Sequence, residues 1–415
     1  MGRRLGTATV KRWTLAAVLC VLVNGAPGAF AEPAVHSPSE LARYVDAALA
    51  RDPAQELLPL LEQEAAALTR HSHSWFSEGP VGSVYWQDDA ALTDDGLREA
   101  EAGLEWPLWW PRAREAARIL AEASAAEANL HPRYQRWLAA AVVRERLWML
   151  ATAEAALAQA KEAELSSRLL HEQVTARVRA GDLAQADQLM SEQEMLGRAA
   201  ERQAAERDWL TQRAGFELLV GLPADLRDLT PERVADIESD AHPGLALLAQ
   251  KVKRAEAEWQ QLRARGAGAP VLQIGGRRER GSRDEPAIDS LGMGLRVPFG
   301  GAVAKSPDRA AAQRAWGEAR LQWRQALRDH AVSRQEAQAA LQQALEIQPL
   351  VERRAELAQR QQDLAQAAFA AGELDLMDLL RIREQARLTI RESERQHLTI
   401  GWSTARLNQI LGDVP

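Results

Sequence analysis

Cysteine is nearly absent from the sequence: Cys20 is the only one among 415 residues, and it lies in an apolar run near the N-terminus. Beyond that run the chain therefore offers no disulfide, no thiolate metal site and no cysteine nucleophile. Aromatic residues make up only 5%. Alanine, glutamine, glutamate and arginine dominate instead, a composition that favours long helices over sheet-rich globules. The net charge of −7, with basic residues scattered along the chain, gives no electrostatic footprint for nucleic acid.

Recognisable catalytic patterns are missing as well. The sequence contains no glycine-rich phosphate loop, and no nucleophile–base or paired-carboxylate set stands in a recognisable context. His71-Ser72-His73 is the only close histidine pair, and two ligands do not make a metal site. We therefore expect a protein that is not an enzyme and that needs neither a metal nor a cofactor.

The N-terminal 31 residues have the pattern of a cleaved export signal. Basic residues at positions 3, 4, 11 and 12 precede the apolar run 13–23, and Ala29-Phe30-Ala31 fits a small-x-small cleavage site. The run is too short to cross a bilayer as a helix. A lipidated Cys20 is the alternative, but Leu19 is a poor neighbour for that modification. The mature chain is expected to begin at Glu32.

The rest of the sequence is an internal duplication. Residues recur at a constant offset of 191 positions: Gly103 and Gly294, Pro107 and Pro298, Gly181 and Gly372, Asp187 and Asp378, Gly221 and Gly412. Upstream, Pro53 pairs with Pro243 at an offset of 190, so one residue was gained or lost between the two sets. The pattern predicts a first repeat at 32–221, a linker at 222–241 and a second repeat at 242–415.

Each repeat is expected to contain the same parts in the same order. A first helix covers 38–72 or 244–265, a long one covers 112–179 or 305–370, and a last one covers 183–220 or 374–411. A helix of roughly 65 residues is about 100 Å long and cannot pack inside an ordinary globular domain. We therefore expect long antiparallel coiled-coil pairs, with alanine allowing close approach of the helices.

A β-hairpin is predicted between the first and the long helix of each repeat, at 80–108 and 270–299. Apolar and polar residues alternate there, as in Leu291-Gly292-Met293-Gly294-Leu295 and around Glu99, Glu101 and Glu105. Strands of this kind occur in transmembrane barrels and in half-buried hairpins of soluble proteins, and the strands alone fit both. Val81–Trp86 predicts only a short first strand. Four strands are too few to close a barrel, so a barrel would need several copies of the chain.

The order and spacing of these parts resemble the TolC family of outer-membrane efflux channels. The resemblance covers the whole mature chain and rests on Leu295-Arg296-Val297-Pro298-Phe299-Gly300, on Phe369-Ala370-Ala371-Gly372-Glu373-Leu374 followed by Asp378-Leu379-Leu380, and on Leu407-Asn408-Gln409-Ile410-Leu411-Gly412. It implies a mainly α-helical protomer whose duplicated hairpins form a trimeric α-barrel. The four strands would join a shared twelve-stranded transmembrane β-barrel.

The resemblance also implies partners and a location. The protein would be the passive conduit of a tripartite efflux pump in the bacterial outer membrane, reaching into the periplasm and meeting outer-membrane lipid. A periplasmic adaptor (membrane fusion) protein and an inner-membrane pump would join it. The adaptor would contact the glycine breaks, which comprise Ala180, Gly181, Leu183, Ala371, Gly372 and Leu374.

Acidic residues crowd both glycine breaks. We expect Asp182 and Glu373 to cap helices. Asp187 and Asp378 are expected deeper in their helices, where three copies facing an axis would form a cation-attracting ring. The strand face with Glu99, Glu101 and Glu105 would likewise be acidic. Trp106, Trp109 and Trp110 fit either an interfacial aromatic anchor or packing at the sheet–helix junction.

Two other functions compete with the channel. A periplasmic adaptor also carries a long helical hairpin, but it should show one hairpin rather than two matched copies. A non-channel coiled-coil scaffold would keep the helices and leave the strands out of the membrane. The compact length resembles outer-membrane components of heavy-metal cation exporters, while drug efflux and type I protein secretion stay open.

Overall fold

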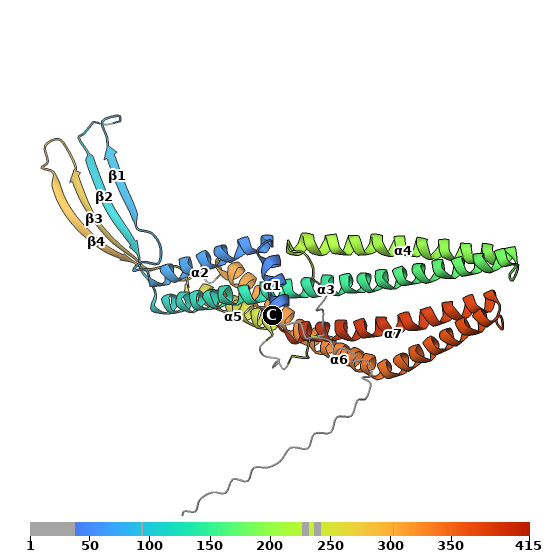
Figure 1. The fold of residues 1–415 in the computed structure, drawn as a ribbon. Coiled ribbons are helices and arrows are strands. Elements are labelled where there is room, and N and C mark those ends of the chain that lie inside the picture. The colour runs from blue at the N-terminus through green and yellow to red at the C-terminus, as the bar shows by residue number, and fades with distance from the viewer. Residues whose placement is uncertain (1–37, 93, 226–231, 236–241, 302) are drawn as a thin grey trace, which may run out of the picture.

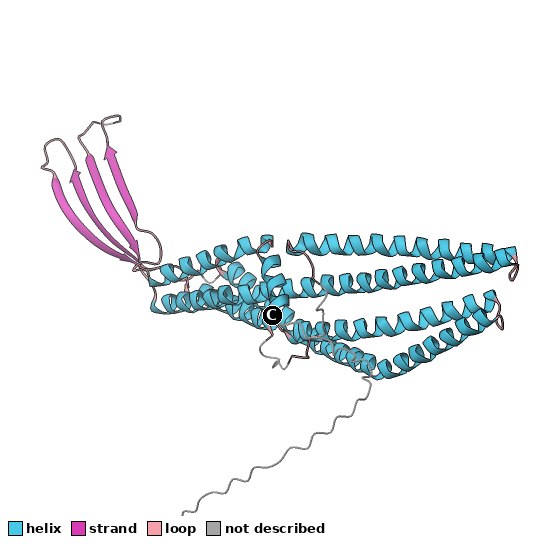
Figure 2. Cartoon of the chain, in the orientation of Figure 1, coloured by secondary structure: helices cyan, strands magenta, loops and turns pink. Residues whose placement is uncertain are grey.

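The protein is an elongated helical rod with a β-sheet at one end (Figure 1). The computed structural model describes residues 38–92, 94–225, 232–235, 242–301 and 303–415. The predicted signal peptide and much of the predicted linker lie outside these residues. Four helices run along the rod in two antiparallel pairs and turn at the end far from the sheet. Figure 2 shows how completely helix and strand are separated along the molecule.

The same order of elements occurs twice. In the first half, α3 (Pro111–Ala180, 70 residues) is followed by α4 (Gln185–Val220), and in the second half α6 (Ser306–Ala371, 66 residues) is followed by α7 (Leu376–Leu411). These long helices confirm the helical interpretation of the alanine-, glutamate- and arginine-rich stretches. None of the helices in the described ranges is both long and apolar enough to cross a bilayer.

Apolar packing is distributed along the rod in small clusters. One cluster joins the first helix to α3 and α4 around Tyr44, Val143 and Phe216, and another joins the far ends of the two pairs around Leu170 and Phe369. The clusters include small side chains that are fully buried, such as Ala140 in the first cluster and Ala405 in a further one beside Trp148. Close approach of helices over alanine thus replaces a thick core, as the composition indicates.

The first helix differs from its prediction. Instead of one helix over 38–72, the chain forms α1 (Pro38–Leu49), a 3₁₀ turn η1 (Pro53–Glu56) and α2 (Leu57–His73). Proline at position 53 has no backbone N–H and restricts Asp52 to extended backbone, which ends the helix before it. The Asp52 carboxylate accepts a hydrogen bond from the Ala54 N–H at 2.9 Å and caps the turn.

The counterpart in the second half is a single helix, α5 (Pro243–Ala264), which starts at a buried histidine. The Nδ1 atom of His242 accepts hydrogen bonds from the N–H groups of Gly244 and Leu245, at 3.1 and 3.2 Å. Burial, together with the neighbouring His330 ring, lowers the pKa of His242 to about 4. The imidazole is therefore neutral at pH 7, as the capping role of Nδ1 requires.

All four strands form one antiparallel sheet in the order β1-β2-β3-β4. The strands are β1 (Val81–Asp88), β2 (Arg98–Pro107), β3 (Val271–Arg280) and β4 (Ile288–Arg296). The two repeats meet where β2 pairs with β3, with Gly103 opposite Gly275. The prediction of a short first strand is wrong, because β1 continues past Trp86 to Asp88 and pairs with β2 along all of its eight residues.

Gly401 gives the fold a sharp test. It is buried on α7, where a Cβ atom would lie 2.6 Å from Cζ3 and 2.8 Å from Cζ2 of Trp148 on α3. We expect Gly401→Ala to destabilise the protein by about 1–3 kcal/mol, because the Trp148 ring must move out of a packed position. Gly197→Ala on α4 is the matched control: nothing lies within 4 Å of its Cβ position, and alanine favours a helix. In thermal unfolding, Gly401→Ala should lower the melting temperature and Gly197→Ala should leave it unchanged or raise it. Equal melting temperatures for the two variants would contradict this packing.

Candidate functional site: the sheet and the helical tips

One face of the sheet is apolar and exposed. The register places Val84, Ala102, Gly276 and Leu291 in one row across the four strands, and Leu104, Ile274 and Met293 in the next. Val84, Leu291 and Met293 are 87%, 84% and 78% exposed. No helix covers this face in Figure 1. A contiguous apolar surface of this kind indicates contact with lipid or with another protein.

The opposite face is polar, but it is less acidic than predicted. Arg277 is 2.7 Å from Glu99, and Arg296 is 3.3 Å from Glu105. These arginines come from β3 and β4, so the strand pairing brings them against the glutamates of β2. The expectation of an acidic strand face therefore needs correction, because arginines partly neutralise it.

Within the described residues, both edges of the sheet are open. β1 pairs only with β2, and β4 pairs only with β3, so each edge strand leaves a row of backbone N–H and C=O groups without a strand partner. Such edges are a template for pairing with another chain. A sheet with one apolar face and two open edges is suited to closure with copies of itself.

At the far end of the rod, each helical pair turns at a glycine. Gly181 and Gly372 are in the left-handed region, with φ of 85° and 80°, where glycine has no steric penalty. The turn after Gly181 is closed by the N–H groups of Gly181 and Asp182, which donate to carbonyls of α3 at 3.0 and 2.9 Å. We call the two turns the helical tips: residues 180–184 and 371–375.

The predicted contact residues differ in accessibility. Ala180, Gly181, Ala371 and Gly372 are exposed on the tips. Leu183 and Leu374 are half-buried and pack against the apolar cluster that includes Phe369 and Leu376. The leucines therefore hold the tips together, and the alanines and glycines form the outer surface.

The prediction that Asp182 and Glu373 cap helices is wrong. α4 and α7 begin two residues later than expected, so both residues belong to the turns, and their side chains cap no helix among the described residues. The Asp375 carboxylate caps α7 by accepting from the Asp378 N–H at 2.7 Å, and the Asp187 carboxylate accepts from the Ala184 N–H at 3.1 Å.

Asp187 and Asp378 thus lie in the first turns of their helices and not deeper. Both are half-exposed, and Asp378 is 2.8 Å from the guanidinium of Arg381. Their equivalent positions at the two tips follow from the duplication. Three copies of such a tip around an axis would still bring these carboxylates together.

The two helical pairs are joined at the tips by Arg177. Its Nη1 donates to the Phe369 carbonyl at 2.9 Å, and its guanidinium lies 5.0 Å from the centre of the Phe369 ring. This contact could not be predicted from the sequence, because the two residues lie 192 positions apart in otherwise ordinary helical stretches. Arg177 and the cluster around Leu170 and Leu379 are the main link between the pairs at this end.

Further along the rod, the two pairs meet over charged side chains. The guanidinium of Arg198 on α4 is 2.6 Å from Glu384 on α7. Next to it lies a cavity of about 180 Å³, where burial lowers the pKa of Arg383. Burial, with Glu162 nearby, raises the pKa of Glu394 in the same cavity. The pairs are therefore separated by a polar seam and are not fused by a dry core.

Within the described residues, no three histidine, cysteine, aspartate or glutamate side chains gather closely enough to hold a metal ion. The surfaces that stand out are instead the open sheet and the exposed tips, at opposite ends of the rod. The arrangement of a four-stranded sheet joined to two long helical pairs is shared with bacterial outer-membrane channels of known structure.

The most informative comparisons are with three of these channels. The outer-membrane protein VceC of Vibrio cholerae has 14% identity and a TM-score of 0.72, covering 90% of this chain and 96% of its own. CusC, solved in a study of folding and transmembrane channel formation, has 14% identity and a TM-score of 0.72 over 90% and 92% of the two chains. The CmeC outer-membrane channel of Campylobacter jejuni has 16% identity and a TM-score of 0.67 over 90% and 85%.

No protein-family model matches the chain, and no curated protein sequence matches it. The protomer fold predicted from the resemblance to TolC-family channels, mainly helical with one four-stranded antiparallel sheet, is confirmed by these structures, which share it over nearly the whole chain. At 14–16% identity the likeness establishes the fold, and function is a separate inference.

Proposed function

We propose that the protein is the outer-membrane channel of a bacterial tripartite efflux pump and works as a homotrimer. The observation that carries this proposal is the sheet, which has one exposed apolar face and two open edges. Pairing β1 of one copy with β4 of the next would satisfy both edges. The apolar faces would then point outward into lipid, and the polar faces would line an aqueous lumen.

Three copies supply twelve strands, which exceed the eight or so that fill their own interior with side chains. The four long helices of each copy would continue the barrel as a hollow helical tunnel across the periplasm. The similar structures support an outer-membrane location, because CmeC is described as an outer-membrane channel and VceC as an outer-membrane protein.

Two alternatives fit the structure less well. A periplasmic scaffold would leave the apolar sheet face in water, which the exposure of Val84, Leu291 and Met293 argues against. A periplasmic adaptor is disfavoured by the two matched helical pairs and by the fold, which is that of the channel component.

The helical tips would face the adaptor, which would bind the exposed surfaces formed by Ala180-Gly181 and Ala371-Gly372. The inner-membrane pump would supply the energy and most of the substrate selection. We extend the proposal to heavy-metal cations, with drugs and secreted proteins as the alternatives. Deleting the gene and measuring sensitivity to cobalt, zinc, cadmium, copper and common drugs would distinguish these substrates.

The channel is tested by single-channel recording of the detergent-extracted protein in a planar bilayer, with its oligomeric state measured on the same sample. Discrete, long-lived current steps from a trimer are expected. A monomer in the soluble periplasmic fraction, with a silent bilayer, would leave the scaffold as the better interpretation.

Asp187→Asn together with Asp378→Asn should lower the cation-over-anion preference of the current, because six carboxylates per trimer lose their charge. Asparagine keeps an oxygen that can accept the Ala184 N–H, so the turn is preserved. Asp208→Asn, an exposed position midway along α4, is the matched control and should leave ion preference unchanged. If all three proteins share one preference, the two aspartates do not line the pore.

A further inference from the structure

A cavity at the junction of the sheet and the helices has no role in the proposed channel function. It measures about 320 Å³ and lies between the ends of β2 and β3 and the first turns of α3 and α6. Its wall contains three cationic side chains, Arg265, Lys305 and Arg309, and two anionic ones, Glu78 and Asp308. The rings of Trp109 and Trp110 lie beside them.

Four of these charged side chains are exposed and accessible to a ligand. Among the described residues, no hydrogen bond or ion pair is made by the side chains of Arg265, Lys305, Glu78 or Asp308. Arg309 donates from Nη2 to the Gly266 carbonyl at 3.1 Å, but its buried Nε–H has no acceptor. The Ser77 hydroxyl in the same wall is also buried without a partner. A buried donor left unpaired is costly, so the cavity is built for polar atoms that come from outside the chain.

A second cavity, which we call the apolar cavity because Arg112 is the only charged residue among the described residues of its wall, adjoins the first. It measures about 530 Å³ and shares Trp110 and Gly266 with the polar cavity. Pro298 and Phe299 form its far side, and Phe299 is 93% exposed. The indole N–H of Trp110 donates to the Gly268 carbonyl at 2.8 Å, which fixes the ring between the two cavities.

The pair of cavities lies at the end of the sheet that meets the helices. The apolar face of the sheet begins at Trp106 and Leu272, two and three residues from the polar cavity's Leu108 and Ala269. If the apolar face sits in the hydrocarbon layer, the polar cavity is at the level of the head groups on the helical side. Tryptophans are enriched at this depth.

We propose that these adjoining cavities form a binding site for one phospholipid with a primary ammonium head group, of the phosphatidylethanolamine type. Its phosphate would be held by Lys305, Arg309 and Arg265, and its ammonium by Glu78 and Asp308. One acyl chain would lie in the apolar cavity over Trp110 and Phe299. The two carboxylates favour this lipid over a purely anionic one, because a second negative group would meet them. The inference rests on the proposed location of the sheet in the outer membrane.

The test is native mass spectrometry of the protein extracted from vesicles of equal phosphatidylethanolamine, phosphatidylglycerol and phosphatidylcholine. The wild type should retain phosphatidylethanolamine in preference to the other two. Lys305→Gln with Arg309→Gln should reduce retention by about tenfold or more, since each basic group near a membrane surface contributes measurably to head-group binding. Arg324→Gln with Arg328→Gln, two exposed arginines further along the same helix, is the matched control and should retain lipid normally.

Two further variants separate the parts of the site. Glu78→Gln with Asp308→Asn should keep total phospholipid but lose the preference for phosphatidylethanolamine over phosphatidylcholine, whose quaternary ammonium cannot donate hydrogen bonds. Phe299→Ser, at a side chain too exposed to affect folding, should weaken retention without changing head-group preference. Soluble glycerophosphoethanolamine should not displace the lipid, because it lacks the acyl chain.

Recording single-channel current from the same vesicles tests the lipid site and the channel independently of each other. A conducting protein whose Lys305→Gln/Arg309→Gln variant retains phosphatidylethanolamine as well as the wild type does would overturn the lipid site and leave the channel intact. Selective lipid retention without conductance would support the site and count against the channel. Protein that neither inserts nor retains lipid would overturn both.

Discussion

Replacing Arg144 by methionine is expected to destabilise the protein by about 3 kcal/mol, although the two side chains are similar in length. Arg144 lies on α3 and is 1% exposed. Its Nε and Nη2 atoms donate to the two carboxylate oxygens of Glu232, both at 3.0 Å, and it forms a second ion pair with Asp413. Removing the guanidinium leaves both carboxylates without their cation, and breaking a buried ion pair from one side typically costs about 3–5 kcal/mol.

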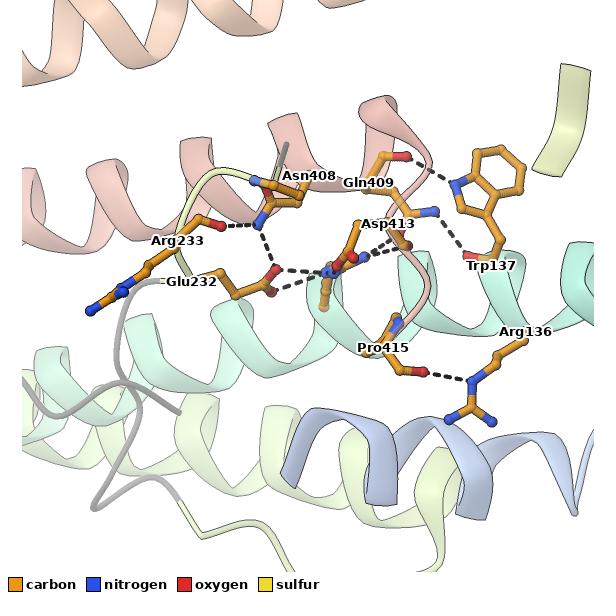
Figure 3. Close-up of polar contacts among 10 residues, drawn as sticks. Arg136, Trp137, Glu232, Arg233, Asn408, Gln409, Asp413 and Pro415 are labelled. Carbon is orange, nitrogen blue, oxygen red and sulfur yellow. Dashed lines mark hydrogen bonds and ion pairs between the residues drawn. The ribbon is translucent and has the colours of Figure 1, made fainter. Parts of the chain in front are cut away.

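The expected cost is at the low end of that range because Glu232 and Asp413 are 19% and 29% exposed and can be partly rehydrated. The network ties three distant segments to one point. Asn408, 2% exposed, donates to Glu232 at 2.9 Å and accepts from the Ala235 N–H at 2.8 Å. In Figure 3, Glu232 from the segment between the repeats and Asp413 from the C-terminal end converge beside α3.

Thermal or urea unfolding in detergent would measure the effect, with Arg136→Met as the matched control. Arg136 also lies on α3 and also reaches the C-terminal end, donating to the Pro415 carbonyl at 2.6 Å, but its side chain is 29% exposed. We expect Arg136→Met to lower the free energy of unfolding by less than about 1 kcal/mol, as for other partly exposed ion pairs. Arg144→Lys should recover only part of the loss, because an ammonium cannot donate to Glu232 as a planar fork. Equal losses at positions 136 and 144 would argue against a buried anchor.

Local chemistry explains which features could be predicted from the sequence. The lengths of α3 and α6 follow from long stretches rich in helix-forming residues, although each helix continues through one internal proline, Pro132 or Pro349. Their ends follow from Gly181 and Gly372. The faces of the sheet follow from strict alternation around Met293. In each case the cause lies within a few residues of the effect, so the sequence pattern records it.

The features that sequence reasoning missed depend on pairing between distant segments. Arg144 and Arg177 resemble any other helical arginine until the fold brings Glu232 or Phe369 against them. Arg277 partly neutralises the polar face of the sheet, but this could be inferred only once the register of β2 and β3 was known. The helix caps were predicted wrongly for a different reason. The Asp182 N–H donates to a carbonyl of α3 in the turn that follows Gly181, and α4 therefore starts only at Gln185.

A charge placed on the exposed apolar face of the sheet should have a large effect on membrane insertion. Met293→Arg should prevent most of the protein from inserting into lipid vesicles. Met293 is 78% exposed and lies between Leu291 and Leu295 in the middle of the apolar row of β4. An arginine at the middle of a lipid-facing strand costs about 2–4 kcal/mol, and a trimer would bear that cost three times.

Gly292→Arg is the matched control, because neighbouring residues of a strand point to opposite faces. A Cβ atom at position 292 meets only the Gly275 carbonyl, at 3.9 Å, so the side chain fits on the polar face. The same charge added one residue away should therefore leave insertion within a few-fold of wild type, as measured by flotation of protein with vesicles. If the two arginines impair insertion equally, the sheet does not expose one face to lipid. If neither impairs it, the sheet stays outside the hydrocarbon layer, and the helical rod must reach the membrane by another surface.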